Sequence, residues 1–301
     1  MSGAGDGALA VRVPVRVDLA GGWSDVHHFA AREGGAVLNA AIDRYVEGSA
    51  RWEGGRLRVA YELALPPGTH LGTSASIDVA WLALANGLLG REQSPVELAE
   101  AAYQLERLLG VEGGKQDQYA AALGGFNLLR FGGEDEPVGV EPVAVPPATI
   151  AALADRCVLC HAGRGQPSGA VHDLVWARYR RGDDEVVAAL RELRDSALRG
   201  RDALLAGDLD GLARVLAVNR EAIRRLHPAI ITPRMDELFA AAEVAGALGS
   251  KPCGAGGGGC LLFICAEGAR PGVEAALRAQ GSELIPFGFA PRAGLEWAGA
   301  G

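Results

Sequence analysis

The stretch Pro66-Pro67-Gly68-Thr69-His70-Leu71-Gly72-Thr73-Ser74-Ala75-Ser76 decides the fold, because it runs directly into a segment, 74–89, that is apolar almost all round. Such a segment predicts a buried helix. Glycines let a backbone approach an anion closely, and a helix start directs free N–H groups and a partial positive charge toward it. The hydroxyls of Thr73, Ser74 and Ser76 can add ligands for phosphate or Mg²⁺. The alternative is a helix cap with a tight turn. A Walker A loop is excluded, because no lysine precedes the hydroxyl residues.

A second glycine-rich stretch is Lys251-Pro252-Cys253-Gly254-Ala255-Gly256-Gly257-Gly258-Gly259-Cys260. It matches G-x-G-x-x-G, but that fingerprint must follow a strand and open a helix. Here we expect a helix that ends near Leu248 before the stretch, and a strand over 260–265 after it. A dinucleotide fold is therefore disfavoured, and a glycine loop that closes over a ligand bound elsewhere fits better. A long flexible turn is disfavoured, because so many glycines are costly to order.

The third stretch is Val13-Pro14-Val15-Arg16-Val17-Asp18-Leu19-Ala20-Gly21-Gly22-Trp23-Ser24-Asp25. Residues 11–19 alternate apolar with polar or basic residues, which predicts a half-buried strand that ends at the glycine pair. Arg16 and Asp25 flank a turn at the end of this strand, where polar groups can reach a site. As isolated residues, they are more often a surface pair.

Two acidic residues lie between these stretches. Glu106 is late in a helix that begins at Pro95, where Ser94 and Glu97 match a capping box. Asp117 follows in Gly114-Lys115-Gln116-Asp117-Gln118. Phosphoryl transfer needs a Mg²⁺ ligand, cations that hold the phosphates, and an acid or base near the acceptor hydroxyl. Glu106 and Asp117 can fill these roles, but a helical glutamate is more commonly a solvated charge, and spacing leaves both interpretations open.

The remaining elements mix without regular βαβ alternation, which predicts an α+β protein. Strands are expected at 42–50, 57–63, 124–131, at Cys157 and from Glu283. Helices are expected at 168–180, 184–205, 209–226, 233–248 and 272–280. The Pro-rich passage 141–147 is the best candidate for a domain boundary.

Composition excludes several classes of function. The chain has 301 residues, 49% of them hydrophobic, and a net charge of −8, which argues against nucleic acid as the main partner. No apolar run approaches the roughly 20 residues that span a bilayer, and residues 1–10 lack the features of a signal peptide. We therefore expect a cytoplasmic protein with reduced cysteines and no membrane partner. The pair Cys157 and Cys160 lies in an apolar run, which favours core packing over a metal or redox site.

Taken together, the three stretches resemble the motifs of the GHMP kinases (galactokinase, homoserine kinase, mevalonate kinase and phosphomevalonate kinase). Their order, their spacing and the Pro-x-x-x-x-Leu-Gly-Thr-Ser-Ala core match over nearly the whole chain. The resemblance implies an ATP-binding N-terminal domain over 1–152, like ribosomal protein S5 domain 2. It also implies a ferredoxin-like C-terminal domain over 153–301, with the site in the cleft between the two.

The resemblance also implies roles for residues, with ATP as the phosphate donor and Mg²⁺ as the metal. By position, Ser74 and Glu106 would hold Mg²⁺. Asp117 would be the carboxylate beside the acceptor hydroxyl, either a base or a positioning group, and Arg16 would face it. Nucleotide phosphates would be bound by Gly68, His70, Gly72, Thr73, Ser74, Ala75, Ser76, Gly256 and Gly257. The acceptor would contact Trp23, Ser24, Asp25 and Gly256.

Within the family, the phrases at 34–43, 114–121 and 254–259 resemble the D-glycero-D-manno-heptose 7-phosphate kinases, whereas 18–25 resembles L-fucokinase. Both make a sugar 1-phosphate, so the expected partner is a small sugar or sugar phosphate, with the heptose phosphate favoured. Arg164 and Lys115 are candidates for a second anion site. A non-catalytic sugar or nucleotide sensor on the same fold is the alternative from another class, and a homodimer is left open.

Overall fold

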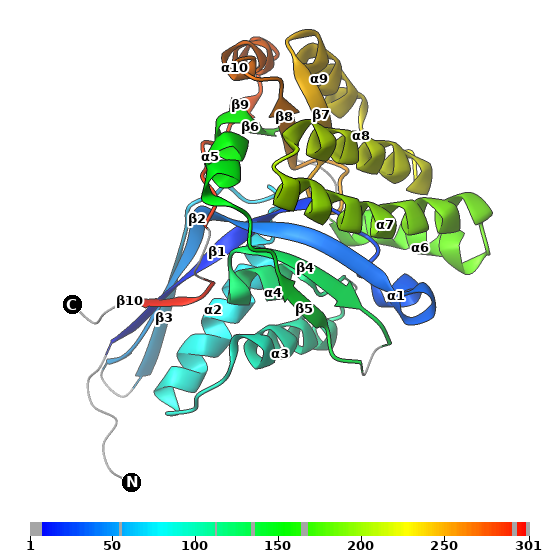
Figure 1. Ribbon diagram of the computed structural model, residues 1–301. Helices are drawn as coiled ribbons and strands as arrows, with labels where there is room; N and C mark the ends of the chain where they lie inside the picture. The colour runs from blue at the N-terminus through cyan, green and yellow to red at the C-terminus, as the bar shows by residue number, and fades with distance from the viewer. Residues whose placement is uncertain are drawn as a thin grey trace.

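The protein is built on two antiparallel sheets that lie in successive parts of the chain (Figure 1). The computed structural model describes residues 8–53, 56–111, 113–133, 136–163, 168–290 and 294–298. Together the elements form the α+β architecture that the sequence predicts.

The first sheet has the order β10-β1-β2-β4-β5, and β3 pairs with β2 outside this path. Its strands are β1 (Leu9–Ala20), β2 (Gly35–Glu53), β3 (Arg56–Leu63), β4 (Phe126–Phe131), β5 (Gly139–Pro142) and β10 (Glu296–Ala298). The strand expected at 11–19 is therefore confirmed as β1, but it is buried on both faces from Val13 onward and is not half-buried as predicted. The last strand of the chain, β10, returns to pair with β1.

Helices cover both faces of this sheet. On one face lie α2 (Thr73–Leu88), α3 (Pro95–Leu108) and α4 (Gln116–Leu123), and on the other lies α7 (Asp184–Ala206), seen above β2 in Figure 1. The short helix α1 (His27–Glu33) follows β1. The capping box that begins α3 is confirmed, because Ser94 Oγ accepts from the Glu97 N–H and Glu97 Oε2 accepts from the Ser94 N–H.

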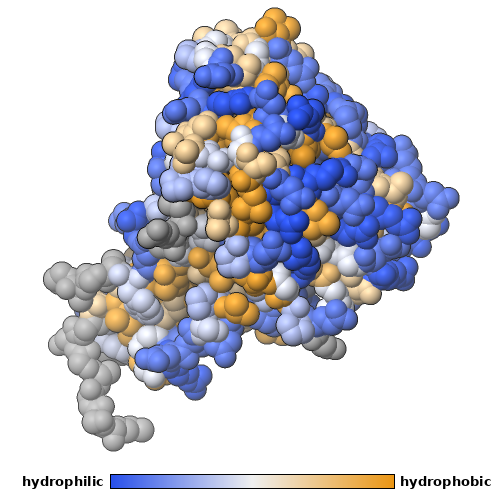
Figure 2. Space-filling model, viewed as in Figure 1, coloured by the Kyte–Doolittle hydropathy of each residue, from blue (hydrophilic) through white to orange (hydrophobic). Residues whose placement is uncertain are grey.

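The second sheet has the order β7-β8-β6-β9. Its strands are β6 (Cys157–His161), β7 (Ala247–Pro252), β8 (Cys260–Cys265) and β9 (Glu283–Leu284). The helices around it are α5 (Pro147–Arg156), α6 (Ser168–Arg180), α8 (Leu209–Leu226), α9 (Pro233–Val244) and α10 (Arg270–Ala279). The surface over α6 and α7 is mostly hydrophilic (Figure 2), and no described helix is long and apolar enough to cross a bilayer.

The expected end of one helix was wrong. The helix expected over 233–248 ends at Val244, because Gly246 adopts a left-handed φ of 106° and breaks it. Strand β7 follows, so the second glycine stretch joins two strands of a hairpin rather than a helix and a strand. The domain boundary expected at 152/153 lies within α5, and the division into two domains there stays a prediction.

A buried ion pair ties the two sheets together. Lys251 on β7 is 0% exposed, and its Nζ lies 2.8 Å from Asp18 Oδ2 and donates to the Asp18 carbonyl oxygen at 2.7 Å. A second link comes from α8, where Asn219 Oδ1 accepts from the Gly21 N–H at 3.0 Å. Both links hold the end of β1, and they therefore fix where its polar residues lie relative to the second sheet.

We expect Lys251→Met to lower the free energy of unfolding by about 3–5 kcal/mol, because it leaves the Asp18 carboxylate buried without its partner. The double variant Lys251→Met with Asp18→Asn should lose clearly less than the single variant. Urea unfolding followed by circular dichroism measures both. Losses that simply add would show that the two side chains do not interact in the folded protein.

Candidate active site

A cavity of about 280 Å³ lies where the two halves of the chain meet. Its walls come from β1 and the turn after it, the loop before α2, the end of α3, the start of α4, α6 and the β7–β8 loop. The lining residues are Arg16, Trp23, Asp25, Val26, Gly68, Thr69, His70, Gly72, Thr73, Ser74, Glu106, Val111, Gly113, Gly114, Gln116, Asp117, Gln118, His172, Gly254 and Ala255. All three stretches singled out in the sequence thus reach one cavity.

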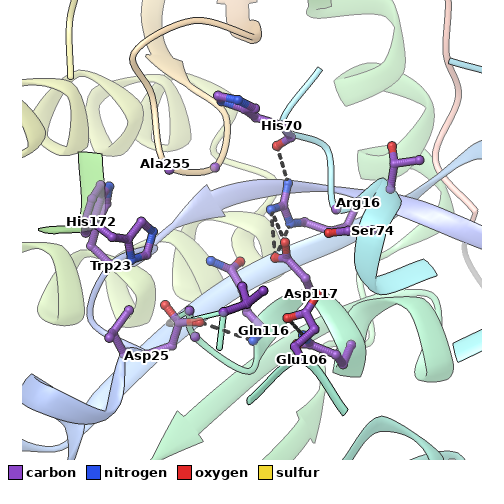
Figure 3. Close-up of a pocket in the computed structure, with 18 of the residues that line it drawn as sticks. Arg16, Trp23, Asp25, His70, Ser74, Glu106, Gln116, Asp117, His172 and Ala255 are labelled. Atoms are coloured by element: carbon purple, nitrogen blue, oxygen red, sulfur yellow. Dashed lines mark hydrogen bonds and ion pairs between the residues drawn. The ribbon is translucent and has the colours of Figure 1, made fainter. Parts of the chain in front are cut away.

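Arg16 and Asp117 form a bidentate ion pair at the centre of the cavity (Figure 3). Arg16 Nε and Nη2 donate to the two oxygens of Asp117 at 2.8 Å each, and Nη1 donates to the His70 carbonyl oxygen at 2.9 Å. Arg16 is 3% exposed, whereas the side chain of Asp117 is 27% exposed. The guanidinium is therefore fully engaged, and the carboxylate it orients is the group that faces the cavity.

Ser74 and Glu106 also lie together, with a third group that the sequence analysis did not single out. Asp78 lies one turn after Ser74 on α2, and both side chains are near enough to Glu106 to affect its pKa. Burial, with Asp117 and Asp78 nearby, raises the pKa of Glu106 to about 8. Gln118 Nε2 donates to Glu106 Oε2 at 2.6 Å. This is a compact group of oxygen donors at the start of a helix.

Asp25 lies at the other end of the cavity. Its Oδ2 accepts from the Gln116 N–H at 3.2 Å, and it is 5% exposed. Burial, together with the charge of Asp117, raises the pKa of Asp25 to about 7. Gly114 packs directly on this carboxylate, since a Cβ there would lie 1.8 Å from Asp25 Oδ2. The carboxylate is thus confined on several sides.

An aromatic pair lines the cavity near Asp25. Trp23 follows β1, and His172 comes from α6 in the second half of the chain. Their ring centroids are 4.4 Å apart with an angle of 25° between the planes, which is a stacked arrangement (Figure 3). His172 was not predicted, and no local sequence signal marks it.

His70 explains two glycines of the β7–β8 loop. Its φ is +57°, which is unusual for a residue other than glycine. A Cβ at Gly259 would lie 2.8 Å from His70 Cγ, and one at Gly254 would lie 2.7 Å from the His70 carbonyl oxygen. The Cys260 N–H donates to the Thr69 carbonyl oxygen at 2.9 Å. The loop is therefore packed against the residues before α2.

Several predicted residues lie outside the cavity wall. Ser24 is 0% exposed, with its Oγ 2.7 Å from the Gly21 carbonyl oxygen, and Ser76 Oγ donates to the Pro14 carbonyl oxygen at 2.8 Å. Ala75 is buried in α2. A Cβ at Gly256 would meet Ile230, and one at Gly257 would meet Val171. These glycines therefore allow the β7–β8 loop to pack against Ile230 and α6.

Among the described residues, neither Lys115, a candidate for a second anion site, nor the two cysteines of the C-x-x-C pair line the cavity. Lys115 is 8% exposed, and its Nζ lies 2.9 and 3.1 Å from the Glu100 carboxylate oxygens, so its charge is already compensated. Arg164 lies outside the described residues.

Cys157 and Cys160 are buried in β6, as expected for core packing. Among the described residues no group of three or more His, Cys, Asp or Glu side chains is arranged to hold a metal.

Two glutamines were missed although they flank Asp117. Gln116 is 6% exposed and Gln118 is 1% exposed, and both line the cavity. Their position beside Asp117 at the start of α4 could have indicated them. Asp78 could also have been found, because residues four apart share a helix face and Ser74 was already a candidate.

A glycine-rich loop at a helix start that opens toward a carboxylate able to orient a hydroxyl has the parts that a phosphotransferase site uses. Residues 36–125 match the GHMP kinases N terminal domain, and residues 201–283 match the GHMP kinases C terminal model. The chain belongs to the GHMP kinase family.

Relatives of this chain include several sugar kinases. It is 23% identical to the D-glycero-alpha-D-manno-heptose 7-phosphate kinase of Campylobacter jejuni, over 96% of this chain and 98% of that protein. It is 25% identical to the bifunctional fucokinase/GDP-fucose pyrophosphorylase of Arabidopsis thaliana, over 85% of this chain but 30% of that protein. A crystal structure of a D-glycero-D-manno-heptose 1-phosphate kinase from Bacteroides thetaiotaomicron matches with a TM-score of 0.77 and 25% identity, over 97% and 99% of the two chains.

We expect Asp25→Asn to stabilise the protein above pH 7. The pKa of this carboxyl is raised in the folded protein, so its ionisation costs stability as the pH rises from about 4, its ordinary pKa, to about 7. The gain from Asp25→Asn should be largest above pH 7 and should shrink as the pH falls toward 4. Thermal unfolding across this range measures it, with the exposed Asp155→Asn as the control. A gain that does not change with pH would contradict the burial of an ionised group.

Proposed function

We propose that this carbohydrate kinase of the GHMP family transfers the γ-phosphate of ATP to the anomeric hydroxyl of a sugar, with D-glycero-D-manno-heptose 7-phosphate as the favoured acceptor. The observation that carries the proposal is the position of Asp117. It lies between the loop before α2 on one side and the Asp25 end of the cavity on the other, oriented by Arg16.

In this proposal the acceptor hydroxyl lies beside Asp117. A bond forms between the hydroxyl oxygen and the γ-phosphorus while the bond from that phosphorus to the bridging oxygen of ADP breaks. The hydroxyl proton moves to Asp117 where the carboxylate acts as a base, or to a phosphoryl oxygen where Asp117 only orients the hydroxyl. Arg16 keeps the carboxylate in place through two parallel hydrogen bonds, which fix its direction as well as its charge.

The residues at the start of α2 suit a nucleotide with Mg²⁺. Hydroxyl and carboxylate oxygens are the donors that Mg²⁺ prefers, and Ser74, Asp78 and Glu106 supply them in one group. Burial raises the pKa of Glu106, and the charges of Asp117 and Asp78 raise it further, so a cation bound beside it would stabilise the ionised carboxylate. Ser74 and Glu106 would hold the ion, which would neutralise charge on the phosphates. The backbone N–H groups at Gly72 and Thr73 would face the phosphates.

The preference for heptose 7-phosphate as the acceptor rests on the relatives of this chain. The two heptose phosphate kinases match over nearly the full length of this chain. The Arabidopsis fucokinase match supports a free sugar as the alternative. A non-catalytic sensor is the other alternative, but a sensor has no need of Asp117, Arg16 and the donor group together.

The direct test is ATP consumption with Mg²⁺ across a panel of free sugars and sugar phosphates, with phosphorus NMR of the product. A new anomeric phosphate made from heptose 7-phosphate alone is the expected result. The same product from fucose would move the proposal to the free sugar. Sugar or nucleotide binding without turnover would favour the sensor.

We expect Asp117→Asn to lower kcat by about 10²–10⁴-fold while nucleotide binding stays nearly intact, because the amide cannot take a proton or supply the charge. Steady-state kinetics and calorimetry with a nonhydrolysable ATP analogue measure the two effects. Asp155→Asn, an exposed aspartate on α5, is the matched control. A near-normal kcat in Asp117→Asn would remove the residue from the mechanism.

A further inference from the structure

We propose that Trp23 and His172 together form a wall that binds the apolar face of the acceptor's sugar ring, so that His172 of α6 is a specificity-determining residue. This inference rests on the proposed sugar kinase function. The two rings belong to different halves of the chain, stack at 4.4 Å and both line the cavity beside Asp25 (Figure 3).

Trp176 contacts both rings of this wall. Trp176, one turn after His172 on α6, is 0% exposed, and its Nε1 donates to His172 Nδ1 at 3.4 Å. The Trp176 ring lies 6.1 Å from the Trp23 ring. The hydrogen bond from Trp176 restrains the tilt of the His172 imidazole, so the stacked pair has a defined orientation in the cavity wall.

Trp23 adopts this position at a cost in backbone strain. Its φ is +80°, in the left-handed region that a bulky residue rarely enters. Such strain persists only where the surroundings enforce it. Here a tight turn does so, since the Ser24 N–H donates to the Gly21 carbonyl oxygen and the Val26 N–H donates to that of Trp23. The turn therefore holds the Trp23 ring on the wall of the cavity, where it can contact a ligand.

The chemistry around the pair suits a sugar ring. A sugar ring presents C–H groups on its faces and hydroxyls at its edge, so an aromatic wall with polar groups beside it matches both. Asp25 supplies a carboxylate next to the wall. Gln116 is 6% exposed, and its Oε1 is buried without a hydrogen-bond partner among the described residues. A hydroxyl donor from the acceptor would satisfy this amide, since an orphaned buried polar group is costly.

The test compares variants of His172 with the acceptor that the sugar panel identifies. We expect His172→Ala to raise the KM for the sugar about tenfold, the loss of roughly one aromatic contact, with the KM for ATP unchanged. His172→Phe should recover most of the loss because it restores a flat ring. Leu174→Ala, at an exposed position of the same helix, is the matched control and should behave as wild type.

Two results would contradict the proposal that Trp23 and His172 bind the sugar ring. One is an equal change in the KM for sugar and ATP, and the other is a failure of His172→Phe to recover when thermal unfolding shows it folded. If the wild-type protein phosphorylates no sugar, the proposed function fails. In that case, quenching of tryptophan fluorescence by heptose 7-phosphate and by L-fucose tests sugar binding at Trp23 and His172 independently of turnover. Quenching in wild type that is lost in His172→Ala supports it, and no quenching with either sugar overturns it.

Discussion

The structure depends on a guanidinium that is buried only because it is completely paired. Arg16 is taken out of water on β1, where an unpaired charge would cost several kcal/mol. It avoids this cost by binding both oxygens of Asp117 and the carbonyl oxygen of His70. One side chain thereby joins the first strand, the loop before α2 and the start of α4. The geometry at the centre of the cavity is therefore set by contacts within the protein and does not wait for a ligand.

The same centre concentrates negative charge. Asp117 contributes to the raised pKa of Asp25 on one side and of Glu106 on the other, in each case after burial itself. Asp117 therefore disfavours the ionised forms of both Asp25 and Glu106, in an environment that already solvates charge poorly. A ligand that brings a cation to Glu106, or hydroxyl donors to Asp25, offsets this effect. Binding at one end of the cavity should then favour binding at the other, through the charge of Asp117.

Sequence signals found the elements with strong local chemistry and missed those without it. The capping box and proline predicted the start of α3, and the apolar run predicted α2. Helix α4 has no side-chain cap, and β7 follows α9 so closely that the two read as one helix. The pair Arg16 and Asp117 is separated by 101 residues, so only resemblance to a family could join them. The stack of Trp23 on His172 depends on how two halves of the chain dock, which no local pattern encodes.

The fit of His70 between Gly254 and Gly259 has a consequence for how this sequence can change. A side chain at either glycine collides with His70, whose own backbone conformation favours a smaller residue. Positions 70 and 259 are thus coupled, because the His70 imidazole is what a methyl group at 259 would meet, although the φ of +81° at 259 disfavours any side chain there. Replacing His70 by glycine would remove that imidazole. At 254 the obstacle is the backbone carbonyl oxygen of residue 70, which every amino acid retains, so Gly254 stays constrained whatever side chain position 70 carries.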